Sequence, residues 1–215
     1  MWQEKKISIL FLSLIFSLSQ VSLYSKEDSL PLDTKKILSK RYYKRIEEKY
    51  QPYLVDSEKY TSQIGKEIHL KYYKHLLGIA EDLANNKNLK IKEGSLGFYY
   101  DKNLPEQKKL FFGIDVVVDK VTESDFSDAC LLIFKKNIYK IADTIKKNNF
   151  FENDKDISGF VLSFEWDKND PQQKFIIWIN KKDLFKFLAK KIIFNEIIER
   201  SALTDAKGKI ITLKI

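Results

Sequence analysis

The amino-acid sequence predicts an α+β fold in which an antiparallel sheet of about six strands carries its helices on one face. Long segments place apolar residues at every third or fourth position, the period of a helix with one buried face. Two other segments, residues 96–119 and 160–180, alternate apolar with other residues, the period of a hairpin. Helix and hairpin signals follow one another three times, at residues 56–119, 124–180 and 182–215. We therefore expect three αββ units arranged in two layers.

Four helices are expected from the apolar spacing and the residues at the helix ends: 34–50, 56–85, 125–148 and 182–200. Asp56 is a suitable N-cap for the second helix, and Thr122 or Ser124 for the third. The last segment is apolar around most of its circumference, which indicates a buried or sandwiched helix.

The two faces of the predicted sheet differ in their environment. One face carries residues such as Phe98, Phe112 and Phe164, which pack on the helices. The opposite face is expected to carry Tyr99, Phe111, Val117, Val161, Ser163 and Glu165. An apolar patch of that size is not normally left bare, so we expect the N-terminal helix or a partner to cover it.

The N-terminus is typical of a secretory signal peptide. Lys5 and Lys6 precede an apolar run from Ile7 to Leu18 that is too short to span a bilayer comfortably, and small polar residues follow. Cleavage after Ser19 or after Ser25 fits, and an uncleaved anchor is the alternative. The predicted organisation is a signal peptide (1–25), a polar connector with a basic helix (26–55) and an α+β domain with internal repeats (56–215).

Cysteine content and charge narrow the expected compartment and partners. Cys130 is the only cysteine, so no disulfide forms and no cysteine follows the leader to carry a lipid. We expect Cys130 to be a small buried hydrophobic residue of a soluble, periplasmic protein. The net charge of +8 favours an acidic protein surface, an acidic glycan or anionic lipid as partner. An exported protein rarely meets nucleic acid, so none is expected.

The first helix contains a candidate interaction surface. Basic and aromatic side chains are concentrated at Lys40, Arg41, Tyr42, Tyr43, Lys44 and Arg45. One interpretation is a docking face for an acidic partner in an envelope or filament assembly. The other is a solvated helix that its tyrosines attach to the body of the protein.

An internal repeat links the two hairpins. Residues 96–108 and 162–174 align without gaps, and eight of the thirteen positions are identical. The match predicts either a duplication or convergence on residues that favour turns. If duplicated, the two turns would lie as paired loops at one end of the sheet and present Lys102, Asn103, Lys168 and Asn169.

The search for catalytic chemistry is negative. The sequence contains no nucleophile elbow, P-loop or dinucleotide-binding motif. His69 and His75 are six residues apart on one predicted helix and cannot bind one metal ion together; we expect both at its surface or boundary. The carboxylate pairs Asp115/Asp119, Asp154/Asp156 and Asp167/Asp170 are expected to be solvated. No active site, metal or cofactor is therefore predicted. A weak calcium site in the loop of Asp154 and Asp156 is the alternative for that pair, although the loop lacks the ligand number and the glycine of an EF-hand.

The leader, the lysine-rich composition and the paired Asp-Lys-Asn turns at 101–108 and 167–174 also support a resemblance to a known family. In outline, an exported chain of this size built of helix–hairpin units resembles the periplasmic flagellar-sheath (flagellar-coiling) proteins of spirochaetes. That resemblance implies a filament-coating protein without catalytic activity, and it implies no particular functional residues.

Two functions are compatible with these observations. The first is an exported, non-catalytic structural or interaction protein of the periplasm or cell envelope, such as part of a flagellar sheath. The second is a periplasmic enzyme or small-ligand-binding protein with its site on the open sheet face or between helix and sheet. A pocket with converging polar groups favours the second, and a flat basic or aromatic surface favours the first.

Overall fold

The computed structural model describes residues 32–86, 89–100, 110–118, 121, 123, 125–148, 154–166 and 173–213. The chain forms two compact units, residues 1–46 and residues 47–215. Helix α2 (Leu32–Tyr50) begins in the first unit and ends in the second. Tyr50 and Leu54, at the start of the larger unit, are buried. None of the described helices combines the length and the apolar character that crossing a bilayer requires.

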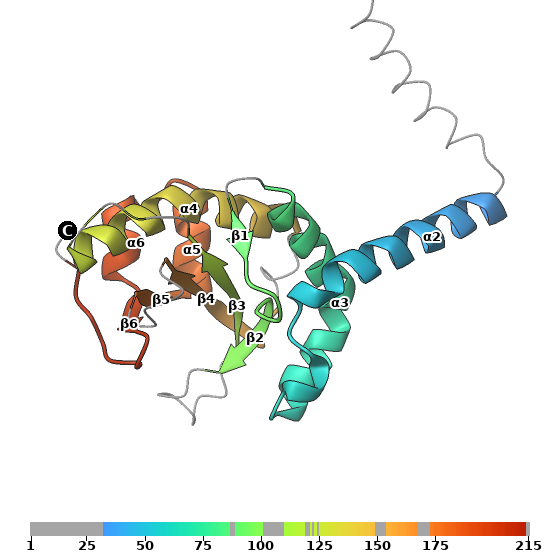
Figure 1. Cartoon of the computed structure of the whole chain (residues 1–215), viewed down its shortest axis with the longest axis horizontal. Helices are drawn as coiled ribbons and strands as arrows, with labels where there is room; N and C mark the ends of the chain where they lie inside the picture. The colour runs from blue at the N-terminus through green and yellow to red at the C-terminus, as the bar shows by residue number, and fades with distance from the viewer. Residues whose placement is uncertain are drawn as a thin grey trace, which may run out of the picture. The chain divides into compact units, whose positions relative to one another are not determined.

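A sheet of six mostly antiparallel strands forms the centre of the larger unit (Figure 1). The strands are β1 (Lys90–Ile91), β2 (Gly97–Tyr100), β3 (Leu110–Val117), β4 (Ile157–Glu165), β5 (Lys174–Asn180) and β6 (Ala202–Asp205). β1 and β2 both pair with the same edge of β3, and the order then continues through β4 and β5 to β6. The α+β fold and the strand number agree with the sequence prediction.

The pairing of β3 with β4 is parallel, which corrects the expectation of a wholly antiparallel sheet. These strands are joined through α4 (Phe126–Asn148). The helix returns the chain to the end of the sheet at which β3 began, so that Leu110 pairs with Ile157. A helical crossover of this kind produces parallel neighbours, whereas a short turn produces antiparallel ones.

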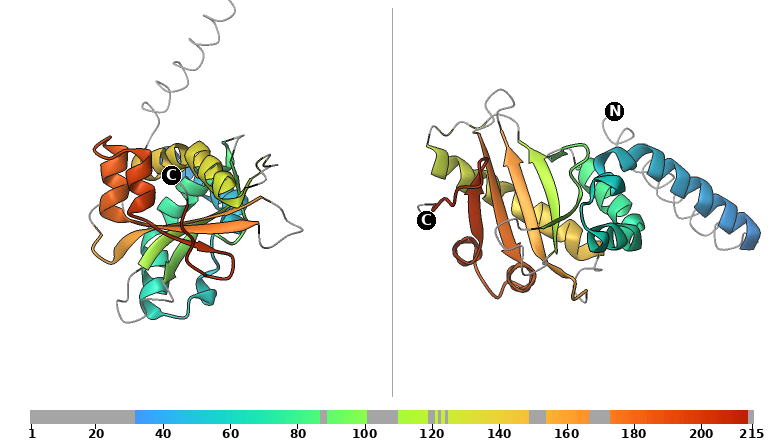
Figure 2. Two further views of the ribbon diagram at one scale, coloured as in Figure 1. Left: turned by 90° about the vertical axis from the view of Figure 1, so that its left-hand side faces the viewer. Right: turned by 90° about the horizontal axis from the view of Figure 1, so that it is seen from below.

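Helices cover one face of the sheet. On that face, Phe112, Phe160 and Ile179 lie side by side across β3, β4 and β5 and are fully buried. Aromatic contacts join this face to the helices: Tyr72 of α3 (Gln63–Ala84) to Phe98 at 6.5 Å between ring centroids, and Phe134 of α4 to Phe164 at 6.4 Å. The right-hand view of Figure 2 shows α4 behind the strands, with the opposite sheet face toward the viewer.

The helix starts differ from the expected ones because of local hydrogen bonding. Ser62 caps α3 by accepting the N–H of Gly65, at 3.1 Å. Asp56 instead caps the short 3₁₀ helix η2 (Ser57–Lys59) by accepting the N–H of Glu58. At α4, Asp125 accepts the N–H groups of Ser127 and Asp128, whereas Thr122 and Ser124 lie outside the described residues.

The expected helix at 182–200 is two helices, α5 (Lys181–Leu188) and α6 (Phe194–Glu199). Lys190 adopts a left-handed conformation, with φ of 56°. The N–H groups of Lys190 and Lys191 then bond to the carbonyls of Phe187 and Lys186, which is a Schellman ending. The apolar character around the whole segment therefore reflects two short helices that bury different faces.

The three stretches of the proposed repeat do not have the same elements. α3 and α4 each precede a hairpin, but the third stretch holds α5, α6 and the single strand β6. Among the described residues beyond β6, an isolated bridge joins Thr204 to Ile210. The ends of the two hairpins also differ in position. β2 ends beside the start of β3, at the Leu110–Ile157 end of the sheet, whereas β4 ends at the Val117–Glu165 end.

Candidate ligand-binding site

The helix-free face of the sheet carries a row of aromatic and aliphatic side chains next to a row of polar ones. The strand register places Tyr99, Phe111, Val117, Val161, Ser163 and Glu165 on this face, as the alternation predicts. In one row across the sheet, Gly113 pairs with Val161 and Val161 with Trp178. In the next row, Asp115 pairs with Ser163, Ser163 with Ile176, and Ile176 with Thr204.

A pocket of about 510 Å³ lies on this face, within the size range of sites for small molecules. β2 to β6 all contribute to it, and the turn after β6 adds Ala206, Lys207 and Gly208. The strand residues that line it are Tyr99, Tyr100, Ile114, Asp115, Val161, Ser163, Lys174, Ile176, Trp178 and Thr204.

Two glycines allow aromatic rings to lie flat on this face. A Cβ at Gly113 would come within 2.3 Å of the Tyr99 ring, and a Cβ at Gly159 within 2.7 Å of the Phe111 ring. The Tyr99 hydroxyl donates to the carbonyl of Ser95 at 2.6 Å, which fixes the ring in place. The Phe111 ring in turn meets Trp178 edge-on, with centroids 5.1 Å apart. The apolar part of the site is therefore rigidly packed before any ligand binds.

Charged groups lie beside the apolar part of the pocket. Lys174 of β5 reaches across β4 to Asp115 of β3, with Nζ and Oδ2 3.5 Å apart. The Asp115 side chain is 31% exposed and that of Lys174 is 24% exposed, so a ligand can reach both groups. Burial raises the pKa of the Tyr99 hydroxyl, and the neighbouring Asp115 carboxylate raises it further. Tyr99 is therefore a neutral hydrogen-bond donor.

Ser163 lies between these charged residues at the floor of the pocket. It is 4% exposed, and its hydroxyl has no hydrogen-bond partner among the described residues. Buried polar atoms normally have partners, and leaving one unpaired costs about 1–3 kcal/mol. This unpaired hydroxyl, beneath a lined pocket, is a candidate partner for a polar ligand atom.

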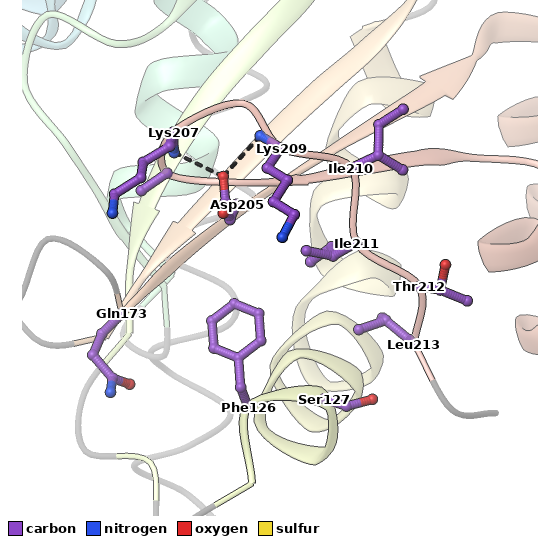
Figure 3. A pocket seen from close by; sticks show the side chains of 11 residues that line it. Phe126, Ser127, Gln173, Asp205, Lys207, Lys209, Ile210, Ile211, Thr212 and Leu213 are labelled. Carbon is purple, nitrogen blue, oxygen red and sulfur yellow. Dashed lines mark hydrogen bonds between the residues drawn. The ribbon is translucent and has the colours of Figure 1, made fainter.

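A second pocket, of about 500 Å³, lies on the other side of the turn after β6, where Phe126 points toward the C-terminal segment (Figure 3). Ala206 and Lys207 line both pockets, so this turn separates them. Asp205 uses one carboxylate oxygen, Oδ1, to accept the N–H groups of Lys207 and Lys209. Because Oδ1 of Asp205 is already engaged in stabilising the turn, it is less available to a ligand. The second pocket is therefore the weaker candidate for a binding site.

Several other candidate residues have structural roles. His69 is buried, not at the helix surface, and bonds to the Tyr60 hydroxyl through Nδ1 at 3.1 Å. Asp154 is also buried, which corrects the expectation of a solvated carboxylate. Cys130 is fully buried as expected, and burial raises the pKa of its thiol to about 12. Within the described ranges, no group of three His, Cys, Asp or Glu residues is placed to hold a metal ion.

The basic segment of α2 is largely exposed. Lys40, Arg41, Lys44 and Arg45 are exposed, Tyr42 is 51% exposed and Tyr43 is half-buried. The Arg45 guanidinium lies 5.9 Å from the centre of the Tyr42 ring, so charge and aromatic surface occur together there.

The paired-loop residues Lys102, Asn103, Lys168 and Asn169 lie outside the described residues. The strands that flank the two turns end at opposite ends of the β3–β4 pair.

The sequence alone did not assign several pocket residues, among them Lys174, Ile176, Trp178 and Thr204 of β5 and β6. The alternation along β5 contained a usable signal, because it places Ile176 and Trp178 together on the face away from Phe175 and Ile177. The pairing of Lys174 with Asp115 had no such signal, since the two residues are 59 positions apart.

Comparisons with protein-family models, with curated proteins and with solved structures find no match to this chain. The resemblance to flagellar-sheath proteins is therefore neither supported nor contradicted by relatives and stays a prediction.

Proposed function

We propose that this protein is an exported, periplasmic small-molecule-binding protein whose ligand occupies the pocket on the helix-free sheet face. The observation that carries the proposal is the unpaired Ser163 hydroxyl at the floor of a pocket that also exposes Asp115 and Lys174. The signal-peptide pattern of the N-terminus supports the exported location.

The composition of the pocket favours an amphipathic ligand. Val161 and Trp178 offer apolar surface on one side, and Asp115, Ser163 and Lys174 offer hydrogen bonds on the other. Such a division between apolar lining and a few directed polar groups is typical of small-molecule sites. Binding without chemical conversion is the simplest function that these residues support.

The proposal is tested by thermal denaturation of the full chain in the presence of a panel of amino acids, sugars, nucleosides and short-chain acids. We expect at least one class to raise the melting temperature in a concentration-dependent way, because a ligand that binds only the folded state stabilises it. Ile176→Trp, which fills the pocket, should abolish that effect. Leu132→Trp, at an exposed position of α4, is the matched control and should retain it.

Failure of every class to shift the melting temperature would contradict the proposal. An equal shift in wild type and in a folded Ile176→Trp variant would also contradict it, since the ligand would then bind elsewhere. Far-ultraviolet circular dichroism of each variant shows whether the fold is retained.

The second candidate is an interaction protein of the cell envelope, and the exposed basic segment of α2 favours it. Lys40, Arg41, Lys44 and Arg45 present positive charge without burial, which suits an acidic protein or anionic lipid surface. Assembly on a periplasmic filament would be one form of this function.

Charge reversal tests this candidate. Replacing Lys40, Arg41, Lys44 and Arg45 with glutamate should release the protein from the envelope fraction at low salt. The same four residues changed to glutamine should give a weaker effect, because only the attraction is removed. Unchanged fractionation of the glutamate variant would rule out this surface as the attachment site.

A further inference from the structure

We infer that the ligand of the sheet-face pocket is a free α-amino acid with an apolar side chain, bound through both of its charges. This inference rests on the proposed function and names the chemical class that the pocket recognises.

The charges of the pocket are complementary to a zwitterion. Asp115 and Lys174 are opposite charges only 3.5 Å apart, so the pocket floor has a strong dipole but no net charge from this pair. A ligand with one charge would be attracted by one member and repelled by the other at nearly the same distance. A ligand with two opposite charges gains from both.

The separation of the two groups fits an α-amino acid in particular. In such a molecule one carbon atom joins the ammonium nitrogen to the carboxylate carbon, which places the nitrogen about 3 Å from a carboxylate oxygen. That distance is close to the 3.5 Å between Lys174 Nζ and Asp115 Oδ2. The carboxylate can therefore accept from Lys174 while the ammonium donates to Asp115. The charged ends of a longer peptide are too far apart for this pair.

The neighbouring residues decide the orientation of the ligand. Ser163 lies between the strands that carry the two charges, and its hydroxyl can donate to the ligand carboxylate beside Lys174. Lys207, on the turn beyond β6, also lines the pocket. The ammonium group therefore faces β3 and the carboxylate faces β5.

The side chain of the ligand would lie on the adjacent apolar row. Val161 and Trp178 are two residues along their strands from Ser163 and Ile176, a step of about 7 Å. An aliphatic side chain of the length of leucine would extend along this step and contact the indole of Trp178, which Phe111 holds in place from the other side.

The experiment is isothermal titration calorimetry of the full chain with L-leucine, N-acetyl-L-leucine, L-leucinamide and D-glucose. The acetyl compound lacks the ammonium charge, and the amide lacks the carboxylate. We expect L-leucine to bind and each singly charged analogue to bind at least about tenfold more weakly, because one charged hydrogen bond is lost. D-glucose should not bind.

Variants of the pocket residues test which residue binds the carboxylate of the ligand and which binds its ammonium group. Lys174→Met should remove the preference for L-leucine over L-leucinamide, and Asp115→Asn should remove the preference over N-acetyl-L-leucine. Ser163→Ala should weaken L-leucine binding about tenfold without unfolding the protein. Lys182→Met, at an exposed position of α5 that does not line the pocket, is the matched control and should bind as wild type.

The possible outcomes distinguish failure of the amino-acid assignment from failure of the proposed ligand-binding function. Equal binding of L-leucine and its two analogues, or saturable binding of D-glucose alone, would overturn the amino-acid assignment. The pocket would then still bind a ligand, provided that Ile176→Trp abolishes binding. No binding by any probe or by any compound of the wider panel would overturn both.

Discussion

At the scale of single residues, Gly113 determines whether the pocket has an aromatic wall. It occupies the middle of β3, where any side chain on the helix-free face would meet the rings and methyl groups of its neighbours. The Tyr99 ring occupies the space that a Cβ would need, and Val161 lies on the other side at 2.7 Å. The absence of a side chain at one position thus shapes a site that other residues line.

Gly113→Ala is expected to lower the free energy of unfolding by about 1–3 kcal/mol, because the Tyr99 ring and its hydrogen bond to Ser95 must be displaced. Urea denaturation measures the change. Gly94→Ala is a useful comparison, because nothing lies near its Cβ position and its φ of 68° costs only about 1–2 kcal/mol. If the Gly113→Ala variant bound ligand as tightly as wild type does, the position of the Tyr99 ring would have no role in binding.

His69 is a second residue whose contribution to stability follows from the groups around it. The Tyr60 hydroxyl accepts the N–H of Phe98 at 3.0 Å and lies 3.1 Å from Nδ1 of His69, so the neutral imidazole accepts the hydroxyl proton. Burial lowers the pKa of His69 below 6.5, and Asp56 opposes this effect only in part. The histidine thus joins α3 to the edge strand β2 in its uncharged form.

Because the unfolded chain binds this proton more readily, the free energy of unfolding should fall as the pH decreases from 6.5 toward the lower pKa of the folded protein. Above pH 6.5 the contribution of His69 should be complete. Urea denaturation between pH 4.5 and 8 measures the slope. His69→Gln should remove this part of the pH dependence, whereas His75→Gln, at an exposed position, should retain it. Identical slopes in wild type and His69→Gln would refute the assignment.

At the scale of secondary-structure elements, Asp154 attaches α3 to the start of β4. Lys71 Nζ lies 2.7 Å from Oδ2, the Tyr72 hydroxyl donates to the same oxygen, and the N–H of Asp156 donates to Oδ1. Burial by itself raises the pKa of Asp154, but these hydrogen bonds outweigh it and hold the pKa at about 2. A carboxylate that looked solvated in the sequence is a tertiary anchor.

Asp154→Asn should lower the free energy of unfolding by about 1.5–3 kcal/mol, the typical effect of losing hydrogen bonds to a charged group. In wild type, this contribution should be complete above pH 4 and should be lost as the pH falls from 3.8 to 2. Acid titration followed by circular dichroism measures the loss. Asp156→Asn is the control, because only its backbone takes part in the Asp154 contact; a comparable effect there would contradict the proposed anchor.

The break between α5 and α6 depends on one residue in an unfavourable conformation. Lys190 has φ of 56°, a region that costs most residues about 1–2 kcal/mol and that glycine adopts freely. Lys190→Gly should therefore raise the free energy of unfolding by about 1 kcal/mol in urea denaturation. The adjacent Ala189 has φ of −81°, so Ala189→Gly should instead be neutral or destabilising. A destabilised Lys190→Gly variant would mean that the lysine side chain itself holds the break.

At the scale of the whole molecule, stability should be greatest at the parallel pair in the middle of the sheet. β3 and β4 have neighbours on both sides and residues fully buried on the helix-covered face, whereas β6 pairs in the sheet only with β5. Amide hydrogen exchange should therefore be slowest in residues 110–117 and 157–165 and faster in residues 202–205. Mass spectrometry of peptides from these strands measures the order, and equal protection of β6 and β4 would be evidence against it.

Local patterns predicted most of the elements but few of their ends. The periods of 3.6 and 2 located α2, α3, α4 and both hairpins, and they assigned the residues of the helix-free face. Asp56 and Ser62 are both good capping residues, so the sequence alone could not decide at which of them α3 begins. The packing of the chain determined that Ser62 caps α3 and Asp56 caps η2. The single helix expected at 182–200 was wrong for a similar reason, since its apolar residues bury in two directions.

In the candidate site too, local sequence patterns predicted some features and tertiary packing determined the others. The sequence alone determined the composition of the sheet face, because alternation depends only on neighbouring residues. It did not determine that β3 and β4 run parallel, that Lys174 reaches Asp115, or that Tyr99 lies across Gly113. These contacts join residues far apart in the chain, and the pairing of the strands in the folded protein sets their register. The tertiary structure therefore decided where charges and rings converge, and with them the lining of the candidate pocket.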